Sequence, residues 1–194
     1  MKFIETIKIV NGIASNIELH TERAIETILH HFGVKRKLPF ELLIPDGFKK
    51  KRGVFKLRVI YSIEIESFTI EPYKPKRTRS LKLVDGGDID YSYKYEDRSE
   101  IEKLLLQREN CDDILIVKNG FITDTSYTNI LFSEGSQLYT PSTYLLNGVK
   151  RQQMLRDRII AEKPLKVEDL NKTSGIYLIN SMIELTNVCR YAVR

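Results

Sequence analysis

The sequence predicts an α+β fold in two parts. Runs of β-branched and aromatic residues alternate with turn dipeptides along most of the chain, whereas helical periodicity is confined to three segments. The 194 residues suffice for one large domain or two small ones. Segment 74–90 contains a proline, a basic run and two adjacent glycines, which is typical of a crossover between domains. We therefore expect a small N-terminal domain over residues 1–75 and a larger C-terminal domain over residues 76–194.

The N-terminal part is predicted to contain three strands and one helix. Residues 2–10 alternate between apolar and polar, which indicates a strand, and Asn11-Gly12 suits a tight hairpin turn. Residues 18–33 carry apolar side chains near helical spacing, with Gly33 as the C-terminal cap. Residues 54–73 are rich in β-branched and aromatic side chains and predict two long strands.

The C-terminal part is predicted to contain two hairpins and two helices. The dipeptide Asn119-Gly120 between two apolar runs is a strong hairpin signal, and Glu134-Gly135 marks a second one. Ile101, Leu104 and Leu105 form the apolar stripe of the first helix. The predicted hairpins cover 114–126 and 129–141, the helices cover 96–110 and 151–163, and a strand pair or bent strand covers 175–188.

Composition excludes several classes of partner. The net charge is +5, and basic residues gather at 49–52 and 74–79, but both clusters lie beside turn residues without interleaved aromatic side chains. We therefore expect an anionic small molecule or a solvated surface, and no nucleic acid. No apolar run approaches the roughly 18 to 20 residues that cross a bilayer, so we expect no membrane partner. Only two cysteines, Cys111 and Cys189, occur; a disulfide between them stays open, but the sparse use fits a reduced cytoplasm.

Motifs of other chemistries do not occur. The chain lacks G-x-S-x-G, G-x-x-x-x-G-K-[ST], H-E-x-x-H and C-x-x-C, so hydrolase, nucleotide-binding and zinc sites have no motif to support them. We expect no metal. The pair His30-His31 precedes the cap Gly33 and suits the negative end of a helix dipole.

Four ordered stretches of the C-terminal part, together with the N-terminal strand and helix, resemble class IV aminotransferase-like enzymes of fold type IV. That family includes branched-chain and D-amino acid aminotransferases and 4-amino-4-deoxychorismate lyases. The N-terminal matches are an F-x-E-T strand at Phe3–Thr6 and an H-x-x-R helix start at His20–Arg23. The C-terminal matches are Tyr93–Arg98, Thr123–Phe132, Tyr139–Pro141 and Gly148–Arg151. The resemblance covers nearly the whole chain.

The resemblance implies pyridoxal 5′-phosphate (PLP) as the cofactor and Lys94 as the catalytic residue that forms a Schiff base with it. Such a lysine needs a neutral amine, which burial and a neighbouring cation favour. Asp124 stands where the family has the glutamate that keeps the pyridine nitrogen protonated. Arg23 and the turns at 148–150 and 180–181 are implied to bind the phosphate. The implied cofactor residues are Arg23, Lys94, Asp124, Asn129, Gly148, Val149, Lys150, Asn180 and Ser181.

The sequence departs from the family pattern at the substrate side. A further strand pair that precedes the F-x-E strand in relatives is not present, so we expect a truncated small N-terminal domain. The long arginine-glycine loop of lyases and D-amino acid transaminases is also missing within 54–68, and Ile4 stands where a tyrosine is expected. These segments supply substrate contacts in relatives.

The favoured function is a 4-amino-4-deoxychorismate lyase that makes 4-aminobenzoate and pyruvate for folate synthesis. The resemblance further implies a small-molecule substrate, a cytoplasmic homodimer and a site near the dimer interface. Three alternatives stay open. They are a class IV aminotransferase acting on D- or branched-chain amino acids, a catalytically silent PLP-binding homologue and, on the basic clusters alone, a nucleic-acid-binding module.

Overall fold

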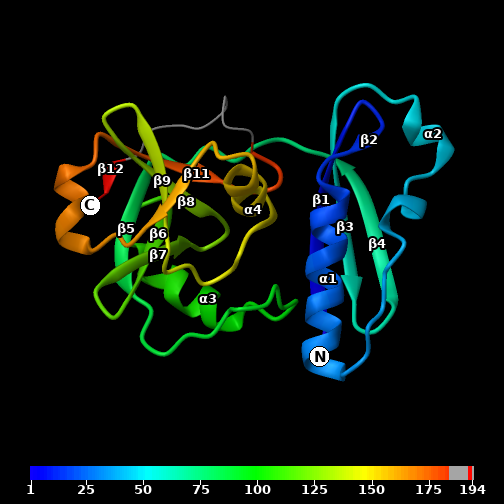
Figure 1. Ribbon diagram of the computed structural model, residues 1–194, viewed down its shortest axis with the longest axis horizontal. Helices are drawn as coiled ribbons and strands as arrows, with labels where there is room; N and C mark the ends of the chain where they lie inside the picture. The colour runs from blue at the N-terminus through cyan, green and yellow to red at the C-terminus, as the bar shows by residue number, and fades with distance from the viewer. Residues whose placement is uncertain (184–191, 194) are drawn as a thin grey trace. The chain divides into compact units, whose positions relative to one another are not determined.

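The computed structural model describes residues 1–183 and the backbone of residues 192–193, and it has the predicted mixed α and β architecture (Figure 1). The chain divides into two compact units, Met1–Pro75 with Tyr93–Asp97 and Lys76–Ser92 with Arg98–Arg194. The chain thus leaves the first unit after Pro75 and returns to it for five residues. The assignment of residues 1–75 and 76–194 to two domains stays a prediction.

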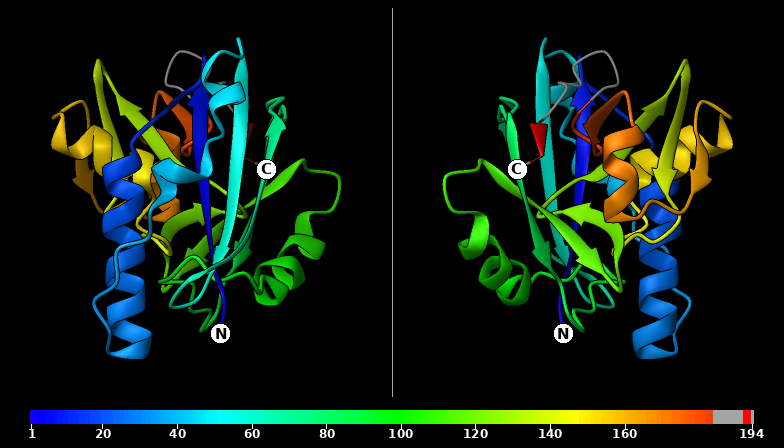
Figure 2. Two further views of the ribbon diagram at one scale, coloured as in Figure 1. Left: turned by 90° about the vertical axis from the view of Figure 1, so that its right-hand side faces the viewer. Right: turned by 90° about the vertical axis from the view of Figure 1, so that its left-hand side faces the viewer.

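The first unit is a four-stranded antiparallel sheet with one long helix along one face (Figures 1 and 2). The strand order is β2-β1-β3-β4, and β1 pairs with β3 along its whole length. Buried apolar side chains of β1, β3 and α1, among them Ile7, Leu57 and Ile28, form the core. The elements are β1 Phe3–Val10, β2 Ile13–Ala14, α1 Ile17–Phe32, α2 Asp46–Lys49, β3 Val54–Tyr61, β4 Ile65–Pro72 and a 3₁₀ turn at Phe40–Leu43.

The local signals at the end of β1 and at the end of α1 act as the sequence indicates. Asn11 and Gly12 both have positive φ, 50° and 86°, as a tight hairpin turn between β1 and β2 requires. Gly33 is left-handed with φ 68° and donates its N–H to the carbonyl of Leu29 at 3.0 Å, which ends the helix. These turns set where β1 and α1 end.

The second unit is built on an eight-stranded mixed sheet (Figure 1). The order along it is β10-β9-β8-β7-β6-β5-β12, and β11 pairs with β8. Leu115, Ile130, Phe132 and Leu178 lie in its buried core. The elements are β5 Ser80–Asp85, α3 Ser99–Leu105, β6 Asp113–Lys118, β7 Phe121–Thr125, β8 Asn129–Glu134, β9 Gln137–Pro141, α4 Val149–Arg156, β10 Ala161–Lys163, β11 Gly175–Ile179, β12 Ala192–Val193 and 3₁₀ turns at Leu106–Arg108 and Val167–Lys172.

The helix predicted over 151–163 is shorter than expected. It ends at Arg156, and Arg158 adopts a left-handed φ of 57°. Ile160 then enters a buried cluster that packs α4 onto β8 and β11, and Ala161–Lys163 pair in parallel with β9. The parallel pairing of residues 161–163 with β9 therefore replaces the last part of the helix that the apolar spacing of this segment predicts.

Two other predicted segments also differ from the structure. Segment 74–90, predicted as a crossover, contains strand β5, which pairs in parallel with β6 and buries Leu81. The flanking proline and glycines obscure this strand in the sequence. The helix predicted over 96–110 is regular only over Ser99–Leu105, where Ile101 is buried. Residues 184–188 of the predicted final strand pair, like Cys189, lie outside the described residues.

Candidate active site

Lys94 is fixed to the edge of β1 by backbone hydrogen bonds. The N–H of Ile4 donates to the carbonyl of Lys94 at 2.9 Å, and the N–H of Glu96 donates to the carbonyl of Lys2 at 2.9 Å. Strand β2 covers only the far end of this edge, where it pairs with residues 9 and 10. Residues 93–97 therefore act as a short added strand, so the position of the Lys94 backbone is set by the sheet.

The residues before and after Lys94 in the sequence, Tyr93 and Tyr95, both pack against other aromatic rings. The ring of Tyr93 stacks on His30 of α1, with centroids 4.7 Å apart and planes 22° apart. The ring of Tyr95 lies 5.4 Å from that of Phe3 on β1. Lys94 itself is half-buried. The sequence predicts that tyrosines shield this lysine from water. Because successive side chains of an extended segment point to opposite faces, the packing of Tyr93 and Tyr95 leaves that shielding a prediction.

Arg23 is held by a buried carboxylate on β1. Glu5 is fully buried, and its two oxygens accept hydrogen bonds from Nε of Arg23 at 2.8 Å and from Nη2 at 2.6 Å. His20 Nδ1 lies 2.6 Å from the same carboxylate. Burial alone would raise the pKa of Glu5, but the Arg23 charge and the His20 hydrogen bond lower this pKa to about 2. Glu5 is thus ionised and forms a two-point ion pair with Arg23.

His20 is neutral in this cluster. Burial lowers its pKa below 6.5, the hydrogen bond to Glu5 opposes that change, and the charges of Arg23 and Lys94 lower the pKa further. Because an ionised carboxylate only accepts, Nδ1 of His20 carries the proton that it donates to Glu5. Its Nε2 is buried and has no hydrogen-bond partner within residues 1–183.

In the second unit, Asp124 lies at the end of β7 with 6% of its surface exposed. Its Oδ1 accepts from Nδ2 of Asn129 at 2.8 Å, and its Oδ2 accepts from the backbone N–H groups of Leu145 at 3.1 Å and Leu146 at 2.9 Å. Burial raises the pKa of Asp124 to about 6, although these donors partly offset it. In the described part of the chain, no lysine or arginine forms an ion pair with Asp124.

Asn129 and Gly148 approach so closely that only glycine fits. The Asn129 side chain also donates to the carbonyl of Leu146 at 2.8 Å. A Cβ on Gly148 would lie 2.0 Å from Oδ1 of Asn129. Gly148 is the N-cap of α4, and the first helical residues are Val149, which is buried, and Lys150. Asp124, Asn129 and the start of α4 thus form one connected group.

A buried arginine supports the turn that leads into α4. Arg151 donates to Oδ1 of Asn147 at 3.0 Å and to the carbonyl of Pro141 at 3.3 Å, and it pairs with Glu162 of β10. The side chain of Lys150 bonds to Gln153 at 2.8 Å. The helix start is therefore held from the inside, and its first backbone N–H groups keep a fixed direction.

Asn180 forms a turn directly after β11. Its Oδ1 accepts from the N–H groups of Met182 at 2.8 Å and Ile183 at 3.1 Å, and its side-chain amide donates to the carbonyl of Tyr127 at 3.5 Å. Ser181 is half-buried within this turn. Asparagine stabilises such turns because its side chain accepts hydrogen bonds from the backbone two or three residues later, so Asn180 has a structural role as well as any binding role.

The first unit thus holds Arg23 and Lys94 of the predicted site, and the second holds the other seven residues. The sequence matches Glu5 to a family motif but assigns it no role. The sequence nevertheless indicates a role for Glu5, because this charged residue lies on the same strand face as the apolar residues Phe3, Ile7 and Ile9. Such a residue is almost never fully buried unless it is paired.

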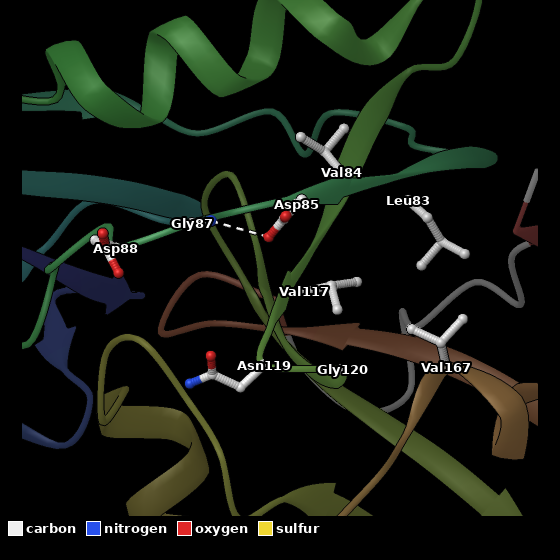
Figure 3. Close-up of a pocket in the computed structure, with 9 residues that line it drawn as sticks. All are labelled: Leu83, Val84, Asp85, Gly87, Asp88, Val117, Asn119, Gly120 and Val167. Carbon is white, nitrogen blue, oxygen red and sulfur yellow. Dashed lines mark hydrogen bonds between the residues drawn. The ribbon is translucent and has the colours of Figure 1, made fainter.

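A pocket of about 470 Å³ opens between β5 and the turn that joins β6 to β7 (Figure 3). Apolar side chains, such as Leu83 and Val117, and the acids Asp85 and Asp88 line it, and Asp85 accepts a hydrogen bond from Gly87. None of the predicted site residues lines this pocket. A second pocket of about 420 Å³ is lined by Thr123 and Leu145, among others. Of these two pockets, the second adjoins the Asp124 group.

Among the described residues, no group of three or more histidine, cysteine, aspartate or glutamate side chains could hold a metal ion. No helix in the same part of the chain is long and apolar enough to cross a bilayer.

Comparison with known proteins gives a consistent family. The family of class IV aminotransferases matches residues 97–191. An uncharacterized protein of Haemophilus influenzae (strain Rd) is 36% identical over 180 residues, which is 92% of this chain and 96% of that protein. A crystal structure from Haemophilus somnus 129PT, provisionally named a 4-amino-4-deoxychorismate lyase, is 34% identical with a TM-score of 0.84, and the match covers 95% of this chain and 97% of that one.

A more distant structure shows the fold alone. It is provisionally named an amino-acid aminotransferase, from Mesorhizobium loti, and is 18% identical with a TM-score of 0.79 over 100% of this chain and 99% of that one. Members of the matched family are PLP-dependent lyases and aminotransferases. By these full-length matches and the family motifs that it carries, the chain belongs to the class IV aminotransferases.

Proposed function

We propose that this protein is a PLP-dependent 4-amino-4-deoxychorismate lyase, which releases 4-aminobenzoate and pyruvate and so serves folate synthesis. The choice of a lyase is supported by the full-length similarity to the Haemophilus somnus structure of that provisional name. The observation that carries the cofactor assignment is Asp124, a buried carboxylate with a raised pKa and no ion-pair partner in the described residues.

A protonated pyridine nitrogen would supply the cation that Asp124 lacks. Each carboxylate oxygen has two lone pairs, and within the described residues Oδ1 of Asp124 accepts one hydrogen bond, from Asn129. A cation at this position would lower the raised pKa of Asp124 and keep the carboxylate ionised. The residue is shorter than the glutamate of relatives, but the amides of Leu145 and Leu146 hold it in place.

Backbone donors near Asp124 fit a phosphate group. We propose that the first N–H groups of α4, at Val149 and Lys150, bind the phosphate together with the turn at Asn180 and Ser181. The absence of space for a side chain at Gly148 suits a close approach of the backbone to a ligand. Arg23 would add the fixed positive charge.

Lys94 is the proposed catalytic residue. PLP, when bound, supplies an electron sink that stabilises negative charge on the substrate carbon. The Nζ of Lys94 would carry the cofactor and be released by the substrate amine. As a free amine it would accept the ring proton next to the substrate nitrogen and return a proton to the departing enolpyruvyl group, which leaves as pyruvate.

Pyruvate release tests this function. Purified protein with PLP and 4-amino-4-deoxychorismate should form pyruvate and 4-aminobenzoate in equal amounts, as measured by a coupled reduction of pyruvate. The activity should need PLP, vanish in Lys94→Ala and persist in the matched control Lys103→Ala, which changes an exposed lysine of α3.

Other outcomes would support other functions. Amino transfer to a 2-oxo acid without pyruvate release would make the protein an aminotransferase for D- or branched-chain amino acids. PLP binding without either activity would indicate a silent homologue, and RNA or DNA binding without PLP binding would favour the basic module.

We also propose that the protein is a homodimer, as the family resemblance implies. Sedimentation of the PLP-loaded protein should give twice the chain mass, and a monomer at micromolar concentration would contradict it. The cytoplasmic location stays a prediction.

A further inference from the structure

We propose that Glu5 is a positioning residue that aims the Arg23 guanidinium at the cofactor phosphate and thereby sets a preference for the phosphorylated cofactor. The inference deepens the proposed function and rests on it, because it requires PLP as the ligand. Glu5 would not contact the cofactor. It would act through Arg23.

The first argument is the geometry of the ion pair. Glu5 contacts Arg23 at two points, through Nε at 2.8 Å and Nη2 at 2.6 Å, so the plane and direction of the guanidinium are both fixed. This fork uses two of the five N–H donors that a guanidinium carries. Arg23 is 18 positions away in sequence, so the contact depends on the packing of α1 against β1.

The second argument is the burial gradient across the pair. The Glu5 side chain is fully buried, whereas the Arg23 side chain is 10% exposed. The acid is therefore the more deeply buried member of the pair, and only Arg23 keeps an exposed part. A cation held in this manner keeps its charge and loses little rotamer entropy when an anion binds.

The third argument is the brace that His20 supplies. His20 is one turn before Arg23 on α1, and its Nδ1 donates to Oε2 of Glu5, the same oxygen that accepts from Nη2 of Arg23. Because His20 is neutral, it adds no positive charge that would compete with Arg23 for the carboxylate. The three side chains form a fixed unit with a net charge near zero before the phosphate binds.

A purely structural role is the competing explanation, because buried ion pairs also hold cores together. The two roles differ in one measurable quantity, the ratio of the dissociation constants for pyridoxal and PLP. Pyridoxal has the same ring and aldehyde but no phosphate. A structural defect would weaken the binding of both ligands alike, whereas a misdirected Arg23 guanidinium would weaken the binding of PLP alone.

The experiment measures both dissociation constants by absorbance titration of the wild-type protein, Glu5→Gln and Glu71→Gln. Glu71 is a matched control, since it pairs with Lys56 on the same sheet but is exposed. We expect Glu5→Gln to weaken PLP by about tenfold or more and to leave pyridoxal within about twofold, in line with the loss of a charged hydrogen bond. Glu71→Gln should match the wild type for both ligands.

An unchanged pyridoxal-to-PLP ratio in Glu5→Gln would overturn the inference. If that variant does not fold, Glu5→Asp gives the same comparison, because it keeps the buried charge but is too short to reach both nitrogens of Arg23. Its ratio should fall, and a wild-type ratio would again overturn the proposal. Failure of the proposed function looks different: the wild-type protein itself would then bind neither ligand, or would show no preference for PLP.

Discussion

Each unit holds a buried carboxylate that bears on the predicted site, Glu5 in the first and Asp124 in the second, and these two behave in opposite ways. In the first unit, Glu5 is fully buried and has a pKa lowered to about 2. In the second unit, Asp124 is almost as buried and has a pKa raised to about 6. Glu5 meets a guanidinium and a histidine, whereas Asp124 meets only neutral amide donors.

The difference shows which carboxylate has its charge balanced by the protein before any ligand binds. Amide donors do not fully repay the cost of moving a charge out of water, but a paired cation can. Glu5 has that cation within its own unit, so its role is satisfied before any ligand binds. Asp124 has no ion-pair partner among the described residues, and the more distant charge of Arg151 offsets its burial only in part, so a cationic ligand group would complete the balance. This contrast is the physical basis of the cofactor proposal.

The largest expected effect is on stability in the first unit. Glu5→Gln removes the anion but leaves Arg23 buried, so it should lower the free energy of unfolding by about 3 kcal/mol. Asp124→Asn removes a charge without an ion-pair partner but replaces one accepting oxygen by an NH2 group that faces N–H donors, so it should lower the free energy of unfolding by a smaller amount, about 1–2 kcal/mol at pH 7.5. Urea unfolding of the apoprotein measures both. Equal losses in the two variants would break the comparison.

The second prediction concerns catalysis, for which we expect Asp124 and not Glu5 to have the larger effect. Asp124→Asn should lower kcat by about a hundredfold, because a neutral amide cannot hold a ring nitrogen protonated. The exposed ion-pair residue Asp46 supplies a control, and Asp46→Asn should keep wild-type kcat. Steady-state pyruvate release decides, and a wild-type kcat in Asp124→Asn would show that this carboxylate has only a structural role.

Much of this arrangement could be predicted from the sequence. The α+β class and the family follow from the ordered motifs around Lys94 and Asp124, and both are confirmed. Arg23 is also identified by its motif, although its role stays a prediction. Short-range signals such as Asn11-Gly12 and Gly33 suffice for turns and helix ends, because a positive φ is a local property.

Contacts between distant segments could not be predicted in the same way. The fork from Arg23 to Glu5 needs the packing of a helix on a strand, and the fit of Asn129 against Gly148 needs the fold of the loop between them. Strand β5 differs from the prediction because a proline, a basic run and two glycines flank its apolar residues and make the segment resemble a crossover. The end of α4 was misjudged because a parallel pairing with β9 competes with helical spacing.

The third prediction tests the tight contact beside Asp124. Gly148→Ala would place a methyl group 2.0 Å from Asn129 Oδ1, so Asn129 must move and Asp124 loses a donor. We expect a loss of about 1–3 kcal/mol in the free energy of unfolding. Gly47→Ala is the control, because Gly47 has open space and an ordinary backbone. Equal thermal stability of the two variants would contradict the contact.

The smallest expected effects are the opposite pH slopes of the two carboxylates. Glu5 binds protons more weakly when folded, so its contribution is complete above pH 4.5 and is lost as the pH falls toward 2. Asp124 binds protons more tightly when folded, so stability should fall as the pH rises from 3.8 to about 6. Each slope is at most about 1.4 kcal/mol per pH unit.

Unfolding free energies of the apoprotein across this range, compared with Glu5→Gln and Asp124→Asn, separate the two slopes. Removing Glu5 should flatten the acid limb, and removing Asp124 should flatten the fall between pH 3.8 and 6. Slopes of the same sign would contradict the assigned pKa directions.

Everything about the cofactor depends on Lys94, and chemical trapping tests it most directly. The protein loaded with PLP is reduced with borohydride, digested and mapped by mass spectrometry. We predict a stable pyridoxyl group on the peptide that contains Lys94 and no other, and none in Lys94→Ala. Labelling of other lysines, or of none, in the wild-type protein would contradict the account.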